Sequence, residues 1–91
     1  MVRIYKYRLG VDGESVAIKG NISQILDVQA QGGVPTVWIL MDDDVPTQVV
    51  KFTAIGTGWE MDKTMLGSYY RTVQDGNGFV WHYFMEADWM L

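Results

Sequence analysis

The apolar residues of this chain recur at every second position in short runs, and glycine-rich turns separate these runs. Residues 25–31 show the pattern most clearly, because apolar and polar side chains alternate there: Leu26, Val28 and Ala30 against Asp27, Gln29 and Gln31. Successive side chains of a strand point to opposite faces, so this run predicts a strand with one buried face. No long segment carries the 3.6-residue apolar stripe of a helix. The sequence therefore predicts an all-β fold.

Turn signals divide the chain into seven expected strands. The expected strands span residues 2–9, 15–19, 25–31, 36–41, 47–55, 66–74 and 79–85, and residues 59–65 are expected to form an irregular loop. The strongest turn signal is Asp75-Gly76-Asn77-Gly78, because Asn and Gly tolerate the positive φ of a tight hairpin. We expect a single domain over residues 1–91, a compact antiparallel sandwich or small barrel of six to seven short strands with little helix.

Residue types that carry most enzyme chemistry are scarce. The chain has no cysteine, one histidine (His82), and eleven acidic against seven basic residues, for a net charge of -4. One copy therefore cannot supply a cysteine nucleophile, a multi-histidine zinc site or a disulfide framework. The basic residues are scattered and outnumbered, which disfavours duplex nucleic acid as a partner. We expect a protein that is not an enzyme and uses no cofactor.

Apolar and aromatic residues are abundant for so short a chain. It holds four Trp, five Tyr and three Phe, and residues 36–41 and 79–85 carry apolar side chains on both expected faces. A small domain has little interior for this many rings, so part of the apolar surface is expected at a subunit interface or a ligand site. The sequence predicts a homo-oligomer.

The sequence shows no recognisable targeting signal. Its first nine residues alternate charged and aromatic side chains and form no apolar signal segment. No apolar run is long enough to cross a bilayer. We expect a soluble, cytoplasmic protein with no membrane partner.

Gly56-Thr57-Gly58-Trp59 is the sharpest candidate for a ligand site. The two glycines let a ligand approach the backbone, Thr57 offers a hydroxyl, and Trp59 can stack on a base or sugar. Neither a Lys-Ser/Thr pair nor an expected helix follows, so the segment is not a Walker loop. The structural alternative is a bend that ends a strand, with Trp59 packed as a lid on the core.

Tyr69 and Arg71 form a second candidate site. Two positions apart on an expected strand, they share a face, and an aromatic ring beside a guanidinium suits stacking combined with anion pairing. Lys51 would add a further cation for a phosphate. A cross-strand packing pair is the alternative for Tyr69 and Arg71.

Two other features favour structural interpretations. Asp42-Asp43-Asp44 could attract Ca²⁺ or Mg²⁺, but it lacks the Gly and the distal Glu of a calcium loop. We therefore expect a solvated turn and no metal site. His82 lies between Trp81 and Tyr83 on an expected central strand, where a lone histidine is more often a hydrogen-bonded structural residue than a catalyst.

Five stretches of the chain carry a family resemblance. They occur in the same order as in that family and extend over nearly the whole chain: Ile4–Tyr7, Ile25–Pro35, Trp38–Asp42, Gly56–Gly58 and Phe79–Phe84. In these stretches the chain resembles a family of small phage- and prophage-encoded domains of unknown function. The segment from Trp59 to Ser68 departs most from the family pattern. The resemblance implies a phage origin and a compact β-rich fold, and it carries over no catalytic residue.

A phage origin changes the expected function by analogy. Small accessory phage proteins are often inhibitors of host defence, including oligomeric sponges for nucleotide immune signals. We expect a non-enzymatic, phage-encoded sponge for a cyclic nucleotide, acting in the cytoplasm of the infected bacterial host. Bases would stack on Trp59 or Tyr69, and phosphates would meet Arg71, Lys51 and the Gly56–Gly58 backbone. The alternative is a protein-interaction or virion-accessory module with no small-molecule ligand.

Overall fold

The structure is a computed structural model that describes residues 1–88. Seven strands form in this range: β1 (Val2–Arg8), β2 (Ser15–Gly20), β3 (Ile22–Gln31), β4 (Val34–Asp42), β5 (Gln48–Gly56), β6 (Ser68–Gln74) and β7 (Val80–Ala87). A 3₁₀ turn at Lys63–Met65 interrupts the long loop between β5 and β6. Helix is therefore scarce in the described chain, as the sequence predicts.

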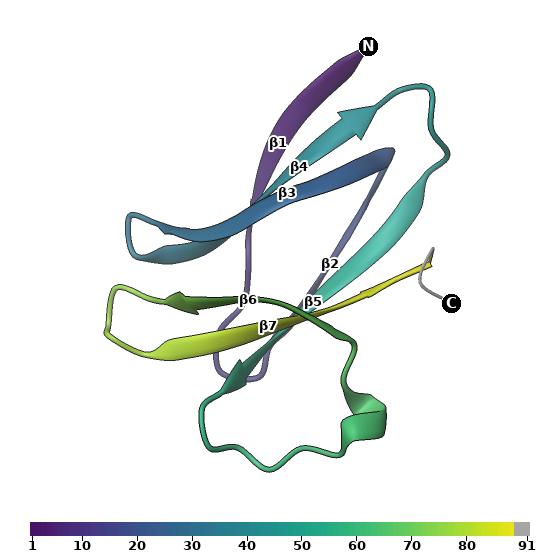
Figure 1. Cartoon of the computed structure of the whole chain (residues 1–91). Coiled ribbons are helices and arrows are strands. Elements are labelled where there is room, and N and C mark those ends of the chain that lie inside the picture. Colours follow the sequence, from purple (N-terminus) through teal and green to yellow (C-terminus); the bar gives the residue numbers. More distant parts are fainter. Residues whose placement is uncertain (89–91) are drawn as a thin grey trace.

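The strands make two antiparallel sheets that pack as the layers of a sandwich (Figure 1). Sheet A has the strand order β1-β4-β3, and sheet B has the order β2-β5-β7-β6. Every strand pair is antiparallel. The sheets do not close into a barrel. The predicted all-β class is confirmed, and of its two predicted architectures the open sandwich is the one formed.

The core lies between the sheets and consists of inward-facing apolar side chains. Val37 and Ile39 of β4 and Tyr83 of β7 have no exposed surface, and Phe52 of β5 is almost completely buried. Burial of such a side chain stabilises the fold by about 1.5–3 kcal/mol relative to its exposure. The Tyr83 hydroxyl donates to the Gly10 carbonyl oxygen at 2.7 Å, and this bond ties the connection between β1 and β2 to the core.

Polar contacts join the two sheets along the side where β3 lies near β6. The Arg71 guanidinium of β6 pairs with the Asp27 carboxylate of β3 at 2.9 Å. The Tyr70 hydroxyl donates to the Ile25 carbonyl oxygen at 3.3 Å, and the Arg71 guanidinium lies 5.5 Å from the Tyr70 ring centre. These side chains link two edge strands that have no ladder of backbone bonds between them.

The hairpin from β3 to β4 differs in detail from the predicted boundaries. Its turn is Gly32-Gly33, and Pro35, expected in the turn, belongs to β4. Pro35 has no N–H, but its carbonyl oxygen accepts a hydrogen bond from the Leu9 N–H at 2.9 Å, so the strand continues through it. Ala30 was predicted to face the core and is exposed, because it lies beside the turn, beyond the covered part of the sheet.

Irregular pairing also changes which side chains of β3 are buried. The register with β4 shifts between Ile25 and Asp27, which leaves Leu26 without a directly opposed residue. Such a β-bulge re-aims the side chains that follow it. Leu26 is half-buried, and Val28 is the residue of the predicted face that reaches the core.

Two turns from different sheets touch backbone to backbone. The Gly76 N–H of the β6–β7 turn donates to the Gly33 carbonyl oxygen at 2.8 Å. Gly33 has a φ of 81°, and a Cβ added to it would stand 2.9 Å from the Gly76 Cα. Both the positive φ and the close approach require glycine at position 33. Turns of the two hairpins thereby meet at one end of the sandwich (Figure 1).

We predict that Gly33→Ala destabilises the fold more than a substitution that only strains the backbone. Gly78→Ala is the matched control, because Gly78 has a φ of 85° but nothing within 4 Å of its added Cβ. Backbone strain alone costs about 1–3 kcal/mol. Urea denaturation should show the larger loss in free energy of unfolding for Gly33→Ala. Equal losses would mean that the turn contact is unimportant.

Candidate functional site

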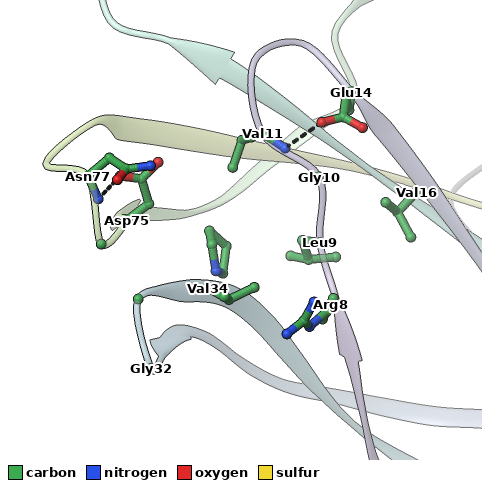
Figure 2. A pocket seen from close by; sticks show the side chains of 13 residues that line it. Arg8, Leu9, Gly10, Val11, Glu14, Val16, Gly32, Val34, Asp75 and Asn77 are labelled. Carbon is green, nitrogen blue, oxygen red and sulfur yellow. Dashed lines mark hydrogen bonds between the residues drawn. The ribbon is translucent and has the colours of Figure 1, made fainter.

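Three connections frame a shallow hollow of about 630 Å³ at the turn end of the sandwich (Figure 2). They are the β1–β2 connection, the β3–β4 turn and the β6–β7 turn. We call this feature the turn-end hollow, and its lining includes Arg8, Val11, Glu14, Val34, Asp75 and Asn77. Glycine backbone from all three connections completes the surface, so a ligand could reach main-chain polar groups there.

The Asp75 carboxylate organises one wall of the turn-end hollow. It accepts hydrogen bonds from the N–H groups of Asn77 at 2.8 Å and Phe79 at 3.0 Å. It also accepts one from the Trp81 indole N–H at 2.9 Å. The indole bond, together with the backbone N–H bonds, holds the pKa of Asp75 below its ordinary value. This carboxylate therefore fixes the turn and the tryptophan behind it.

An aromatic cluster of Trp59, Phe79 and Trp81 is connected to the turn-end hollow through Asp75, which lines the hollow and accepts from the Trp81 indole. The Trp59 and Trp81 ring centres are 5.8 Å apart in an edge-to-face arrangement, and those of Phe79 and Trp81 are 6.1 Å apart. Trp81 is buried, whereas Trp59 is 43% and Phe79 61% exposed. Phe79 pairs with Asp75 across the turn, since the Asp75 N–H donates to its carbonyl oxygen at 2.8 Å. Two exposed rings thus belong to a cluster that Asp75 joins to the hollow.

Trp59 packs as a lid, as the structural alternative for its segment predicted. Its indole lies so close to Gly56 that an added Cβ would stand 2.5 Å from the ring. It also contacts Gly13 of the β1–β2 connection, whose added Cβ would lie 3.4 Å from the ring. These glycines leave room for the indole over the end of the sheet. Whether the exposed part of Trp59 also binds a ligand stays a prediction.

Side-chain hydrogen bonds connect Thr57 to Tyr69 through His82 on the outer face of sheet B. His82 Nε2 lies 2.7 Å from the Thr57 hydroxyl, and His82 Nδ1 lies 2.9 Å from the Thr72 hydroxyl. The Tyr69 hydroxyl lies 2.8 Å from the Thr72 hydroxyl. Within residues 1–88 both imidazole nitrogens therefore have hydroxyl partners, and neither has a carboxylate partner. This is the environment of a hydrogen-bonded structural histidine, and a general base would gain no acidic orienting group from it.

The predicted cations, Lys51 and Arg71, are each paired with an acid and are not part of the hydrogen-bond chain from Thr57 to Tyr69. Lys51 pairs with Glu86 at 3.4 Å on sheet B, and Arg71 pairs with Asp27 across the sheets. Tyr69 and Arg71 were predicted to share a face, and this is wrong. Tyr69 opposes Phe84, whereas Arg71 opposes Tyr83, because the register shifts between the two residues. Neighbouring residues of β7 point to opposite faces, so this bulge separates the ring from the guanidinium.

The acidic run at Asp42–Asp44 forms the turn that the sequence predicts. Asp43 lies 3.6 Å from the Arg3 guanidinium and 3.8 Å from the amino group of Met1. Within residues 1–88 no three His, Cys, Asp or Glu side chains gather as a metal ion would require. The same residues form no helix long and apolar enough to cross a membrane.

Sequence reasoning missed the turn-end hollow, although it found the turns that build it. Arg8 and Glu14 lie close together in the chain, but Asp75 is far from both, and the three residues form no motif. Their meeting depends on the contact between Gly33 and Gly76 and on the bond from Tyr83 to Gly10. The one sequence signal for the hollow is the high glycine content of these turns. It indicates that the backbone of each turn can pack closely against another segment, but it does not indicate which segment.

We predict that Asp75→Asn lowers thermal stability at neutral pH and flattens its dependence on acid. The lowered pKa of Asp75 means that its carboxylate stabilises the fold above the ordinary pKa and that this contribution is lost as the pH falls through the lowered value. Thermal unfolding from neutral pH to about pH 2 measures both effects. In the Asp75→Asn protein, Asp27 should still contribute stability that is lost in acid. The main cause of its lowered pKa is the side-chain hydrogen bond from Gln29, which this substitution leaves in place.

Asp43→Asn is the control for this experiment, because its contacts are those of an exposed ion pair. Such pairs contribute about 0–1 kcal/mol. An Asp75→Asn protein with the stability and acid profile of Asp43→Asn would contradict the structural role of the Asp75 carboxylate.

Comparisons with known proteins place the chain by its sequence. No curated protein and no solved structure matches it significantly. The model of one family matches residues 1–89, and that family is described as a domain of unknown function, DUF7352. The match covers nearly the whole chain, so this protein belongs to the DUF7352 family.

Proposed function

We propose that this chain is a non-enzymatic binding module that holds a protein partner at its turn end. The observation that carries the proposal is that Phe79 and Trp59, 61% and 43% exposed, pack on Trp81, whose indole donates to Asp75 in the wall of a hollow of about 630 Å³. Connections at one end of a sandwich are common binding surfaces, because a rigid scaffold positions them. Exposed aromatic residues are enriched in protein interfaces and are frequent anchors of binding energy.

Charge at the site favours a protein partner over a phosphate ligand. The turn-end hollow combines the Arg8 guanidinium with the carboxylates of Glu14 and Asp75. A bound phosphate there would meet more negative than positive charge. The cations expected to hold phosphates, Lys51 and Arg71, are each paired with an acid. A protein surface with a basic or neutral group opposite the hollow suits this distribution better.

The resemblance found in the sequence extends this proposal to a biological setting. We propose that the chain is a phage- or prophage-encoded accessory protein that acts in the cytoplasm of the bacterial host. Its partner would then be a host protein or another component of the phage. The family description supports neither setting nor partner, so both rest on the resemblance alone.

We predict that Phe79→Ser weakens partner binding without unfolding the chain. The probe is a displayed library of random peptides selected on the immobilised wild-type protein, with the dissociation constant of each enriched peptide measured on the variants. Loss of a ring that anchors an interface costs more than about 1 kcal/mol, or roughly fivefold in affinity. Circular dichroism and thermal unfolding check that the variant stays folded.

Met65→Ser is the matched control, because Met65 is 73% exposed but lies in the 3₁₀ turn, outside the aromatic cluster. Peptides that bind wild-type and Met65→Ser proteins equally, and Phe79→Ser protein weakly, would support the turn-end site. Equal binding to all three proteins would contradict it, as would a library that yields no specific peptide.

Sequestration of a cyclic nucleotide is a second proposal, and one observation favours it. The Tyr69 ring is 57% exposed, and hydrogen bonding to Thr72 fixes its hydroxyl, so the ring offers a positioned surface for a base. The chain from Tyr69 through Thr72 and His82 ends at Thr57, the hydroxyl of the predicted ligand segment.

This second proposal predicts a thermal shift with at least one member of a panel of cyclic nucleotides. Trp59→Ala and Tyr69→Ala should each weaken that binding, by about 1–3 kcal/mol where a stacked base is lost. Asp43→Ala should leave the binding unchanged. The nucleotide should be recovered intact after denaturation of the protein, because His82 has no acidic partner. Cleavage that disappears in His82→Ala would instead indicate an enzyme.

A further inference from the structure

Strand β1 is an edge of sheet A, and its side chains stay largely exposed. It pairs with β4 along its whole length and with no other strand of the described chain. Six of its seven residues are exposed, and these include two aliphatic side chains, Val2 at 58% and Ile4 at 61%. A long, regular edge of this kind has unpaired backbone groups that can bind another strand.

The hydrogen bonds at the two ends of β1 show which backbone groups are free. The Leu9 N–H donates to the Pro35 carbonyl oxygen, and the Asp43 N–H donates to the Met1 carbonyl oxygen. Residues that bond across an antiparallel pair alternate along the strand. Odd-numbered residues of β1 therefore direct their N–H and C=O toward β4. The N–H and C=O groups of the even-numbered residues point to the open edge; these residues are Val2, Ile4, Lys6 and Arg8.

The charges of β1 limit the strands that can pair with this edge. Arg3, Lys6 and Arg8 are three of the seven basic residues of the chain, and β1 contains no acid. Like charges directly opposite each other destabilise a strand pair. A twofold pairing centred on Arg3 or Lys6 would oppose each of those residues to itself. In a register shifted by one residue, the even-numbered residues of one strand would oppose odd-numbered residues of the other, whose N–H and C=O already bond to β4.

We propose that β1 pairs with β1 of a second copy, antiparallel, with Tyr5 on the twofold axis. This register opposes Val2 to Arg8 and Ile4 to Lys6, so no cation faces a cation. All four residues with free backbone groups then form hydrogen-bonded pairs, which exchange about eight bonds at two per pair. Centring on Ile4 also separates the cations but uses only three such pairs. Sheet A would continue across the axis as six strands, three from each copy.

Side chains next to the axis fit this dimer. Tyr5, 45% exposed, would oppose Tyr5 of the second copy in a non-hydrogen-bonded pair, where side chains approach most closely. Arg8 forms no ion pair within residues 1–88. In the dimer it would lie beside Val2 of the second copy, and Asp42 is the residue opposite Val2 on β4. Arg8 and that Asp42 carboxylate would then be complementary across the interface.

Single-cysteine variants test the register, because the chain contains no cysteine of its own. We predict a dimer by analytical ultracentrifugation and rapid disulfide formation by Tyr5→Cys under mild oxidation. Opposed Cα atoms of a non-hydrogen-bonded pair are about 4.5 Å apart, which a disulfide can span. In Arg3→Cys the two thiols would be four residues apart along the strands, or about 14 Å. Tyr5→Cys should therefore cross-link more than about tenfold faster.

Proline at position 4 tests the edge without disturbing the β1–β4 ladder. Ile4→Pro removes an N–H that points to the open edge, and proline is tolerated where a strand's N–H faces solvent. This variant should keep its circular dichroism spectrum and sediment as a monomer, whereas Ile4→Ala should still dimerise.

Three results would overturn the proposal. They are a wild-type mass of one chain at high micromolar concentration, a dimer that survives in Ile4→Pro, and a disulfide that forms as fast in Arg3→Cys or faster in Ile4→Cys. A monomer that binds an acidic β-forming peptide would show that the edge takes a foreign strand instead. None of these outcomes depends on the turn-end site, so the binding proposal is tested separately.

Discussion

The Asp75 carboxylate holds the turn end of this molecule in one arrangement. Its bonds to Asn77, Phe79 and the Trp81 indole fix a turn whose Gly76 packs on Gly33 of the other sheet. That turn forms one wall of the hollow. Asp75 also holds the Trp81 indole, on which Trp59 and Phe79 pack. A single half-buried acid thus couples the packing of the sheets to the candidate binding surface. Because these bonds are to its charged form, they are strongest at neutral pH.

The two sides of the sandwich treat their edge strands differently. Between β3 and β6 the Arg71–Asp27 ion pair joins the two edge strands through their side chains, and the Tyr70 hydroxyl bonds one backbone group, the Ile25 carbonyl oxygen. At β1 the edge stays open and carries cations spaced so that few registers avoid every like-charge contact, and of these the one centred on Tyr5 uses all four residues with free backbone groups. Charged side chains usually discourage edge pairing. Here their spacing discourages most registers and leaves one that satisfies the backbone, which is how a sequence can specify a partner by exclusion.

The sequence predicts the elements of this fold well because two local signals agree. Alternating side chains mark strands, and glycine-containing turns mark where strands end. The hairpin at residues 75–78 and the strand pairs around it form where these signals place them. The signals do not reveal bulges, since a bulge adds one residue without changing composition. Tyr69 and Arg71 were assigned to one face for this reason, and one inserted residue places them on opposite faces.

The candidate site could not be predicted, because it depends on distances between turns that are far apart in the sequence. The sequence singles out Gly56 and Trp59, but Trp59 also packs near Gly13 and against Trp81, which no spacing rule connects to this segment. The cations chosen for a ligand also have acids as neighbours only after the strands pair. Paired charges and exposed rings together are the reason for proposing contact with another protein over phosphate recognition. That reason follows from tertiary contacts, which decide whether a charged side chain is available to a ligand at all.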